Sequence, residues 1–202
     1  ATSKRRLMTA VTNIWAYLDY VFDGLKDTPW REDDRTAPVS AYGWTKLAGE
    51  RGIAAAGGPH VILRSSWVFS AHGGNFVKTM LRLSAERDTL TIVDDQIGGP
   101  TAAGDIADVL LIMAKAFCAG KGVSGVYHFA SAPSVSWRQF AEAIFAEADL
   151  LVDVTPIPTA DYPTPAARPL NSRLNCAKIK VDYDIDQPDW RISLKDVIGE
   201  LT

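Results

Sequence analysis

The chain has 202 residues, of which 47% are hydrophobic and 22% are charged, and its formal net charge is −3. This length predicts one domain that buries roughly 70% of the surface its unfolded form exposes. No apolar run approaches the ~20 residues that a membrane helix requires, and the dispersed basic residues exclude the concentrated positive surface typical of a nucleic-acid-binding protein. We therefore expect a small-molecule ligand.

The two cysteines, Cys118 and Cys176, have no Cys-x-x-Cys spacing. This pattern indicates free thiols in a reducing compartment, so we expect a cytoplasmic protein. The three histidines, His60, His72 and His128, are scattered and lack metal-ligand spacing, so no metal site is predicted.

Residues 1–18 contain no strand-glycine-helix signature and predict a short helix or an irregular arm. From about residue 42 onward, helical and strand patterns alternate, which favours an α/β fold with a parallel sheet. Strands are predicted at 60–69, 89–93 and 125–130, where β-branched and aromatic residues lie between turn signals.

Three apolar stripes at helical spacing predict helices between and after these strands. We interpret the stripes as buried faces, with their Trp and Met side chains as packing residues, and they consist of Phe76, Val77, Met80, Leu81 and Leu83; Ile106, Val109, Leu110, Met113 and Phe117; and Trp137, Phe140, Ala141, Ile144, Phe145 and Ala148. Ser136 and Gln139 have capping-box spacing at the start of the third helix. After Leu150, prolines predict a loop-rich region before a last helix at 192–201.

Tyr42 and Lys46 are four residues apart, so on a helix both side chains lie on one face, one turn from each other. An ammonium group close to a phenol favours the phenolate, which lets the tyrosine deliver a proton to a carbonyl and recover it. Such a pair also arises by chance on an amphipathic helix with one buried ring and one solvated lysine. The neighbouring motifs decide between these two interpretations.

Seven further motifs accompany the pair, in this order: Asp19 to Gly24, Arg64 to Phe69, Gly74-Asn75-Phe76, Asp95 to Thr101, Tyr162 to Ala166, Arg168-Pro169 and Asn171 to Leu174. In order and spacing, they resemble the dTDP-4-dehydrorhamnose reductases, which belong to the extended short-chain dehydrogenases. The resemblance runs from Asp19 to the C-terminus without a large gap.

The resemblance implies an α/β fold, with an incomplete Rossmann-like parallel sheet and a loop-rich C-terminal substrate-binding region. It divides the chain into an unmatched leader at 1–18, the C-terminal part of the Rossmann-like domain at 19–150, and the substrate-binding region at 151–202. The implied reaction reduces the 4-keto group of dTDP-6-deoxy-L-lyxo-4-hexulose to give dTDP-L-rhamnose, with hydride from NADPH or NADH.

Carried over position by position, the resemblance implies that Tyr42 is the general acid, that Lys46 assists it and binds the nicotinamide ribose, and that Ser65 lies at the cofactor. An indole suits the apolar face of a sugar, so Trp67 is expected to pack against the deoxysugar. The same pocket is shaped by Asp19 and Tyr20. Contacts to the nucleotide portion are implied for Asn75, Gln96, Thr101, Arg168 and Arg173, because arginine forks and amide donors bind diphosphates. The segment 171–174 has the alternative role of anchoring the tail by local hydrogen bonds.

In folds of this kind the dinucleotide lies on a glycine-rich turn between the first strand and helix, and we identify no strand-to-helix turn of that type. The family also has a catalytic threonine hydroxyl where this chain has Leu18. Losing a comparable donor costs ~3 kcal/mol, or about two orders of magnitude in rate. We therefore expect a truncated chain whose reductase activity is impaired or lost, with an upstream frameshift or gene truncation as the hypothesised origin. The alternative is a non-catalytic sugar-nucleotide-binding or regulatory subunit that associates, for example as a homo-oligomer, through an exposed sheet edge.

Overall fold

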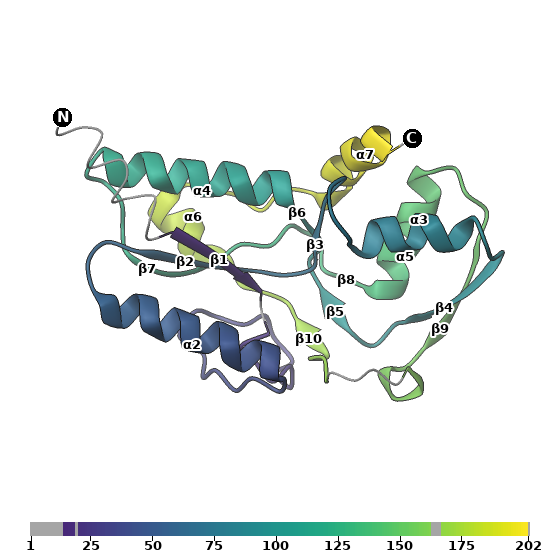
Figure 1. Ribbon diagram of the computed structural model, residues 1–202, viewed down its shortest axis with the longest axis horizontal. Helices are drawn as coiled ribbons and strands as arrows, with labels where there is room; N and C mark the ends of the chain where they lie inside the picture. Colours follow the sequence, from purple (N-terminus) through teal and green to yellow (C-terminus); the bar gives the residue numbers. More distant parts are fainter. Residues whose placement is uncertain (1–13, 19, 163–166, 202) are drawn as a thin grey trace.

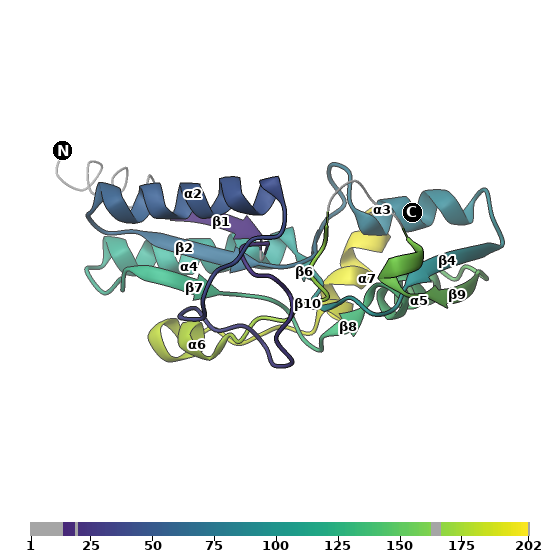
Figure 2. The same cartoon turned by 90° about the horizontal axis from the view of Figure 1, so that it is seen from below.

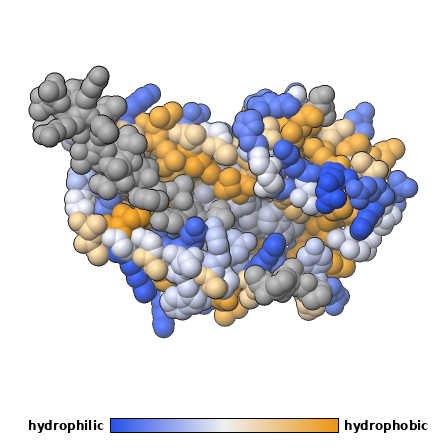
Figure 3. All heavy atoms as spheres, in the orientation of Figure 1, coloured by the Kyte–Doolittle hydropathy of each residue, from blue (hydrophilic) through white to orange (hydrophobic). Residues whose placement is uncertain are grey.

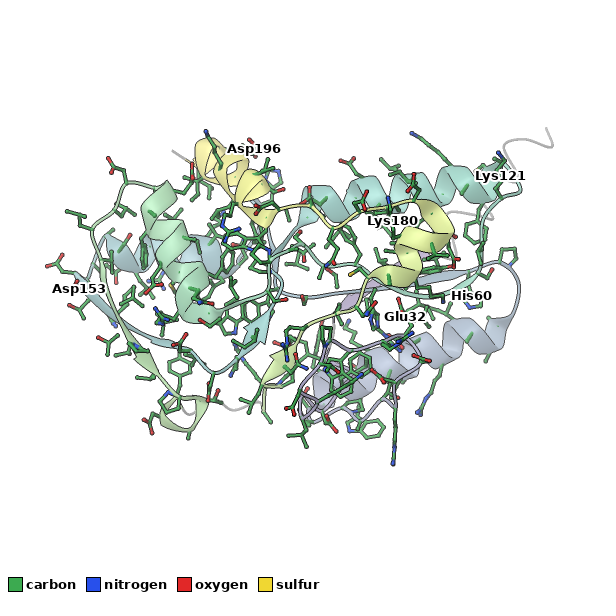
Figure 4. All side chains as sticks on the ribbon, turned by 180° about the vertical axis from the view of Figure 1, so that it is seen from behind. Glu32, His60, Lys121, Asp153, Lys180 and Asp196 are labelled. Carbon is green, nitrogen blue, oxygen red and sulfur yellow. The ribbon has the colours of Figure 1, made fainter. Side chains whose placement is uncertain are left out.

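A computed structural model of the protein describes residues 14–18, 20–162 and 167–201, with the backbone alone for 14–18. Two lobes lie side by side along the long axis (Figure 1). The sheet lobe consists of residues 14–18, 41–65, 103–128 and 177–183, and the helical lobe consists of residues 76–93, 137–157 and 190–201. Lys121 and His60 lie toward the outer end of the sheet lobe, and Asp153 lies at the outer end of the helical lobe (Figure 4).

The sheet lobe is built on three parallel strands, β1 (Ile14–Leu18), β2 (Val61–Ser65) and β7 (Gly125–His128), in the order β1-β2-β7. The helix α2 (Ala41–Ala56) follows β1, precedes β2 and covers one face. On the opposite side lies α4 (Ala103–Cys118), while α6 (Ala177–Tyr183) packs against β7 (Figure 2). Every residue of β2 is buried, as expected for a parallel strand covered on both faces.

The predicted helix or irregular arm at 1–18 was wrong for residues 14–18, which form β1. These residues pair in parallel with β2 from Ile14 opposite Val61 to Leu18 opposite Ser65. The segment Ile-Trp-Ala-Tyr-Leu is an unbroken apolar run, and such a run fits a buried parallel strand although it lacks alternation. Residues 1–13 lie outside the described part of the chain.

In the helical lobe, α3 (Phe76–Ser84), α5 (Trp137–Glu147) and α7 (Trp190–Leu201) pack around a parallel pair of strands, β4 (Thr89–Val93) and β9 (Asp153–Ile157). The predicted strand at 89–93 and the predicted helical stripes are confirmed, and so is the capping box of Ser136 and Gln139. The strand β9 and the helix α6, both in the C-terminal region, were not predicted. Segments from both sides of residue 150 contribute to each lobe.

Short strands lie between the lobes and carry the motifs near residues 97 and 171. One small sheet has the order β10-β5-β8, with β10 (Asn171–Ser172) parallel to β5 (Ile97–Gly98) and β8 (Val135–Ser136) antiparallel to it. A second pairs β3 (Val68–Phe69) with β6 (Thr101–Ala102). The predicted strand at 60–69 is therefore two strands, β2 and β3, which the chain separates at Ser66 and Trp67.

The outward side of α4 exposes Leu111 and Ile112, and apolar atoms are visible along this helix in Figure 3. Within the described ranges, no helix combines the length and the apolar character needed to cross a membrane.

A buried ion pair joins α2 to β2. The Arg64 guanidinium donates to both carboxylate oxygens of Glu50, from Nε to Oε1 at 2.9 Å and from Nη2 to Oε2 at 2.7 Å. The Arg64 Nη1 also lies 3.4 Å from Nε2 of His128, whose Nδ1 is 3.0 Å from the carbonyl oxygen of Trp30. Burial, with the Arg64 charge as the second cause, lowers the pKa of His128 to about 3. The imidazole is therefore neutral, with a hydrogen on Nδ1 donated to Trp30 and Nε2 accepting from Arg64.

We predict that Glu50→Gln lowers the free energy of unfolding by about 3–5 kcal/mol, because it leaves the buried Arg64 charge without a counter-ion. Urea denaturation measures this change. The matched control is Glu86→Gln, which breaks the exposed i,i+4 pair with Arg82 and is expected to cost less than about 1 kcal/mol. Equal effects of the two substitutions would contradict the role assigned to the buried pair.

Candidate active site at the junction of the lobes

The N-terminal turn of α2 carries the Tyr42–Lys46 pair. The helix begins after Ser40, whose hydroxyl accepts a hydrogen bond from the Gly43 amide at 3.2 Å. A Cβ at Gly43 would overlap the carbonyl oxygen of Tyr20, so glycine allows the helix to lie directly against the backbone of the preceding loop. This contact brings Tyr20 next to Tyr42.

The geometry of the pair is that expected for side chains one turn apart. Tyr42 is 44% exposed, and the Lys46 Nζ lies 4.9 Å from the centre of its ring. The ring of Tyr20 meets that of Tyr42 edge-on, with centroids 5.7 Å apart. A phenol that is open to solvent on one side and close to an ammonium group can exchange a proton with a bound carbonyl compound. Asp19, predicted to belong to this pocket, lies outside the described residues.

Ser65 is the last residue of β2 and lies opposite Leu18, the last residue of β1, since the carboxyl ends of parallel strands share one edge of the sheet. Its side chain is buried, and its Oγ has no hydrogen-bond partner among the described residues. A buried hydroxyl without a partner costs about 1–3 kcal/mol, so a water or a ligand is expected to supply the missing bond. The next hydroxyl, that of Ser66, instead donates to the carbonyl oxygen of Gly99 at 2.9 Å.

The spacing Gly-x-Gly-x-x-Gly does occur once, at Gly120, Gly122 and Gly125, a match that the sequence analysis overlooked. This segment leads from the end of α4 into β7, so it joins a helix to a strand. A dinucleotide cradle needs the reverse order, in which the glycines follow a strand and the helix N-terminus faces the phosphates. The segment therefore does not supply that cradle.

Trp67 lies at the corner between β2 and β3, with φ at +47°, a left-handed conformation that is unusual for a bulky residue. Its indole is only 8% exposed and stacks on Trp137, with centroids 3.6 Å apart and an interplanar angle of 10°. The backbone of Gly98 abuts the same indole, and a Cβ there would lie 2.6 Å from Cε2 of Trp67. The structure therefore places Trp67 in an aromatic stack, where Trp137 covers one of its faces.

A groove of about 450 Å³ lies beside this stack. Its walls come mainly from α3 and β4, and its lining includes Gln96, Trp137, Tyr162, Arg87 and Arg168. Of the predicted nucleotide contacts, Gln96 and Arg168 are brought together here. Neither Arg87 nor Trp137 was predicted from the sequence to lie at this groove. The pairing of arginine forks with phosphates applies equally to Arg87, and the apolar stripe that contains Trp137 is interpreted in the sequence analysis as packing alone.

The other three predicted nucleotide contacts are engaged in local hydrogen bonds. Asn75 caps α3, since its Oδ1 accepts from the Lys78 amide at 3.3 Å while its Nδ2 donates to the carbonyl oxygen of Ser70. Thr101 is fully buried, and its hydroxyl donates to the carbonyl oxygen of Gly99. The Arg173 Nε donates to Asn171 Oδ1 at 2.8 Å, and a second nitrogen of its guanidinium donates to the 20–40 loop. These three side chains are not among the residues that line the groove.

Among the described residues, no group of three or more His, Cys, Asp or Glu side chains is arranged to hold a metal ion. Cys118 and Cys176 are both free thiols. Burial raises the pKa of the Cys176 thiol to about 12, which keeps it protonated and unreactive as a nucleophile.

Comparison with known proteins gives consistent matches along the chain. The family model described as "RmlD substrate binding domain" matches residues 9–202, so the similarity begins upstream of Asp19. A dTDP-4-dehydrorhamnose reductase of Escherichia coli (strain K12) is 39% identical over 212 residues, which cover 100% of this chain and 71% of the relative.

Two solved structures of such reductases have the same fold. The enzyme from Bacillus anthracis, in complex with NADP, superposes with a TM-score of 0.87 at 31% identity and covers 96% of this chain and 70% of its own. The enzyme from Clostridium acetobutylicum superposes with a TM-score of 0.85 at 38% identity and covers 93% of this chain and 65% of its own. The Rossmann-like α/β fold inferred from the sequence is thereby confirmed.

We predict that Gly98→Ala displaces the indole of Trp67 and costs about 1–3 kcal/mol of stability, as overpacking of a close contact does. Urea denaturation followed by tryptophan fluorescence reports both the stability and the environment of the stacked indoles. Gly104→Ala is the matched control, because a Cβ there meets no atom within 4 Å. If Gly98→Ala matched this control in stability and in emission, the close contact would not exist in solution.

Proposed function

The chain belongs to the family of dTDP-4-dehydrorhamnose reductases defined by the RmlD substrate-binding domain, and we propose that its site reduces the 4-keto group of a dTDP-linked 6-deoxyhexulose. The observation that carries this proposal is the Tyr42–Lys46 pair on α2, with the ammonium group 4.9 Å from the centre of the phenol ring. Tyr42 would donate its hydroxyl proton to the carbonyl oxygen of the sugar as the carbon is reduced. The nearby Lys46 charge would stabilise the phenolate that remains.

The residues expected on the nicotinamide side are compatible with a dinucleotide. The buried Ser65 hydroxyl has no partner among the described residues, and Tyr42 and Lys46 are on the neighbouring helix end. A nicotinamide cofactor, when bound, supplies the hydride. We propose that Ser65 donates to this cofactor and that Lys46 binds its ribose, while the lack of a strand-to-helix glycine turn makes binding of NADPH or NADH by these 202 residues weak.

The nucleotide portion of the substrate is assigned to the groove. Arg87 and Arg168 both line it, and a guanidinium group suits a phosphate of a dTDP-sugar. Trp137 and Gln96 lie at the end of the groove nearest Trp67, since Trp137 contacts both. Arg168 lies near Gln96, because the Ile97 amide donates to the carbonyl oxygen of Leu170, so a diphosphate held by Arg168 would place its sugar toward the Trp67 corner.

Two further aspects are part of the same proposal. The free thiols Cys118 and Cys176 support a reducing, cytoplasmic location. In the described residues β1 is an edge strand of its sheet, which supports association with another copy of the chain along that edge.

Tyr42→Phe removes the proton donor and is predicted to lower the rate of keto-sugar reduction at least about 100-fold, within the usual range for a general acid. The rate is measured by NADPH oxidation at 340 nm with the dTDP-4-keto sugar. Tyr183→Phe is the matched control, because its hydroxyl bonds the carbonyl oxygen of Val123 at the outer side of the sheet lobe. A Tyr42→Phe variant as fast as the control would refute the assigned acid.

Leu18 ends β1 and pairs in register with Ser65, at the position where the resemblance implies a threonine hydroxyl. Leu18→Thr is therefore predicted to increase the reduction rate by about two orders of magnitude, because it restores a donor to the reacting carbonyl. Leu18→Val is the control, because valine has the shape of threonine without its hydroxyl, and it should leave the rate unchanged. Absence of reduction at saturating NADPH in the wild type and in Leu18→Thr alike would count against a reductase site in this chain.

A further inference from the structure

Trp137 is the first residue of α5 and contacts both parts of the proposed site. Its ring stacks face-on against Trp67 at 3.6 Å, and it also contacts Phe76 with ring centroids 4.5 Å apart. At its edge, Nε1 donates a hydrogen bond to Oε1 of Gln96 at 3.1 Å. One side chain therefore connects the Trp67 corner to the amide that lines the groove.

These bonds determine the orientation of the Gln96 amide. The indole Nε1 can only donate, so the amide oxygen must face Trp137 and the NH2 group must face away from it. That NH2 group donates to Thr159 Oγ1 at 3.0 Å. Thr159 gives its own hydroxyl hydrogen to Asp95 Oδ1 at 2.6 Å, and its backbone amide also donates to this carboxylate. Thr159 Oγ1 is thus left as an acceptor, and the amide orientation is set from both sides.

An NH2 group has two hydrogens, and Thr159 accepts one. Among the described residues the hydrogen bonds of the Gln96 side chain are those to Trp137 and Thr159. The side chain is 6% exposed and belongs to the lining of the groove. Within the described ranges the second hydrogen has no acceptor, and a ligand that uses it must present one.

We propose that Trp137 is a positioning residue that holds Gln96 as a hydrogen-bond donor toward the groove, so that the groove selects nucleotides with an acceptor oxygen at that point. This inference rests on the proposed function, because it assigns the groove to the nucleotide of the substrate. The acceptor is a carbonyl oxygen of a pyrimidine base or an oxygen of the diphosphate, two sources of the same chemistry. Trp67 takes part through the stack, which fixes the plane of the Trp137 indole.

The test is calorimetric titration of the full chain with dTDP, using wild type, Trp137→Phe, Gln96→Leu and the double variant. Phenylalanine keeps an aromatic ring in the stack but has no N–H, so Trp137→Phe should weaken dTDP binding about 3–10-fold, the usual effect of one hydrogen bond. Because Trp137 acts through Gln96, the double variant should bind no more weakly than Gln96→Leu alone. Trp44→Phe, at an indole that is 54% exposed on α2, is the matched control and should bind as wild type does.

Titration with thymidine and with pyrophosphate identifies the acceptor. Weaker binding of thymidine to Trp137→Phe assigns the acceptor to the base, and weaker binding of pyrophosphate assigns it to the phosphates. The proposal is overturned if Trp137→Phe binds dTDP as tightly as wild type, if the two single effects add in the double variant, or if wild type does not bind dTDP.

Reduction assays on the same variants separate this inference from the proposed function. Coupled effects on dTDP binding in a chain that reduces no keto sugar would support the positioning role and contradict the reductase activity. Reduction by wild type together with unchanged dTDP affinity in Trp137→Phe would support the activity and contradict the positioning role.

Discussion

The ion pair between Arg64 and Glu50 is the contact on which the candidate site depends. An arginine on a strand buried on both faces needs a counter-charge, and the Glu50 carboxylate of the covering helix supplies it. The pair therefore fixes both the position of α2 along β2 and its contact with that strand. Ser65 directly follows Arg64 on the strand, and Tyr42 and Lys46 lie on the helix that Glu50 anchors. The relative position of the acid pair and the strand end is thus determined by a contact that takes no part in the chemistry.

A second contact joins the sheet lobe to the helical lobe. Trp67 lies two residues after the end of β2, the strand that carries Arg64, whereas Trp137 begins α5, and the two indoles stack with centroids 3.6 Å apart. Since Gln96 is held by Trp137, the groove in the helical lobe is positioned relative to the strand end through two aromatic rings. The φ of +47° at Trp67 is the backbone strain that this arrangement requires.

Local patterns in the sequence were sufficient for the strand at 89–93, the helical stripes and the Tyr42–Lys46 spacing, because alternation and 3.6-residue periodicity are properties of adjacent residues. The strand β1 was missed since a five-residue apolar run has no period of its own, and α6 was missed because its seven residues follow a proline-rich segment. Asn75, Thr101 and Arg173 were expected at the ligand, but residue type alone does not reveal that their polar groups already have partners. Asn75 and Thr101 bond backbone atoms two to five residues away, and Arg173 bonds Asn171 and the carbonyl oxygen of Asp27. Trp137 was expected to pack in the core and not to contact the ligand site. Its helical spacing identifies the packing, but its hydrogen bond to Gln96 depends on tertiary structure.

The central claim is that one continuous site runs from Arg168 in the groove, past Gln96 and Trp137, to Trp67 and the Tyr42 phenol. A crystal structure of the chain with bound dTDP-L-rhamnose tests this claim most directly. The account predicts the diphosphate at Arg168, an acceptor oxygen at the Gln96 amide, and the sugar directed toward Trp67 and Tyr42. A nucleotide bound outside the groove, or a sugar directed away from the Tyr42 end of α2, would contradict it.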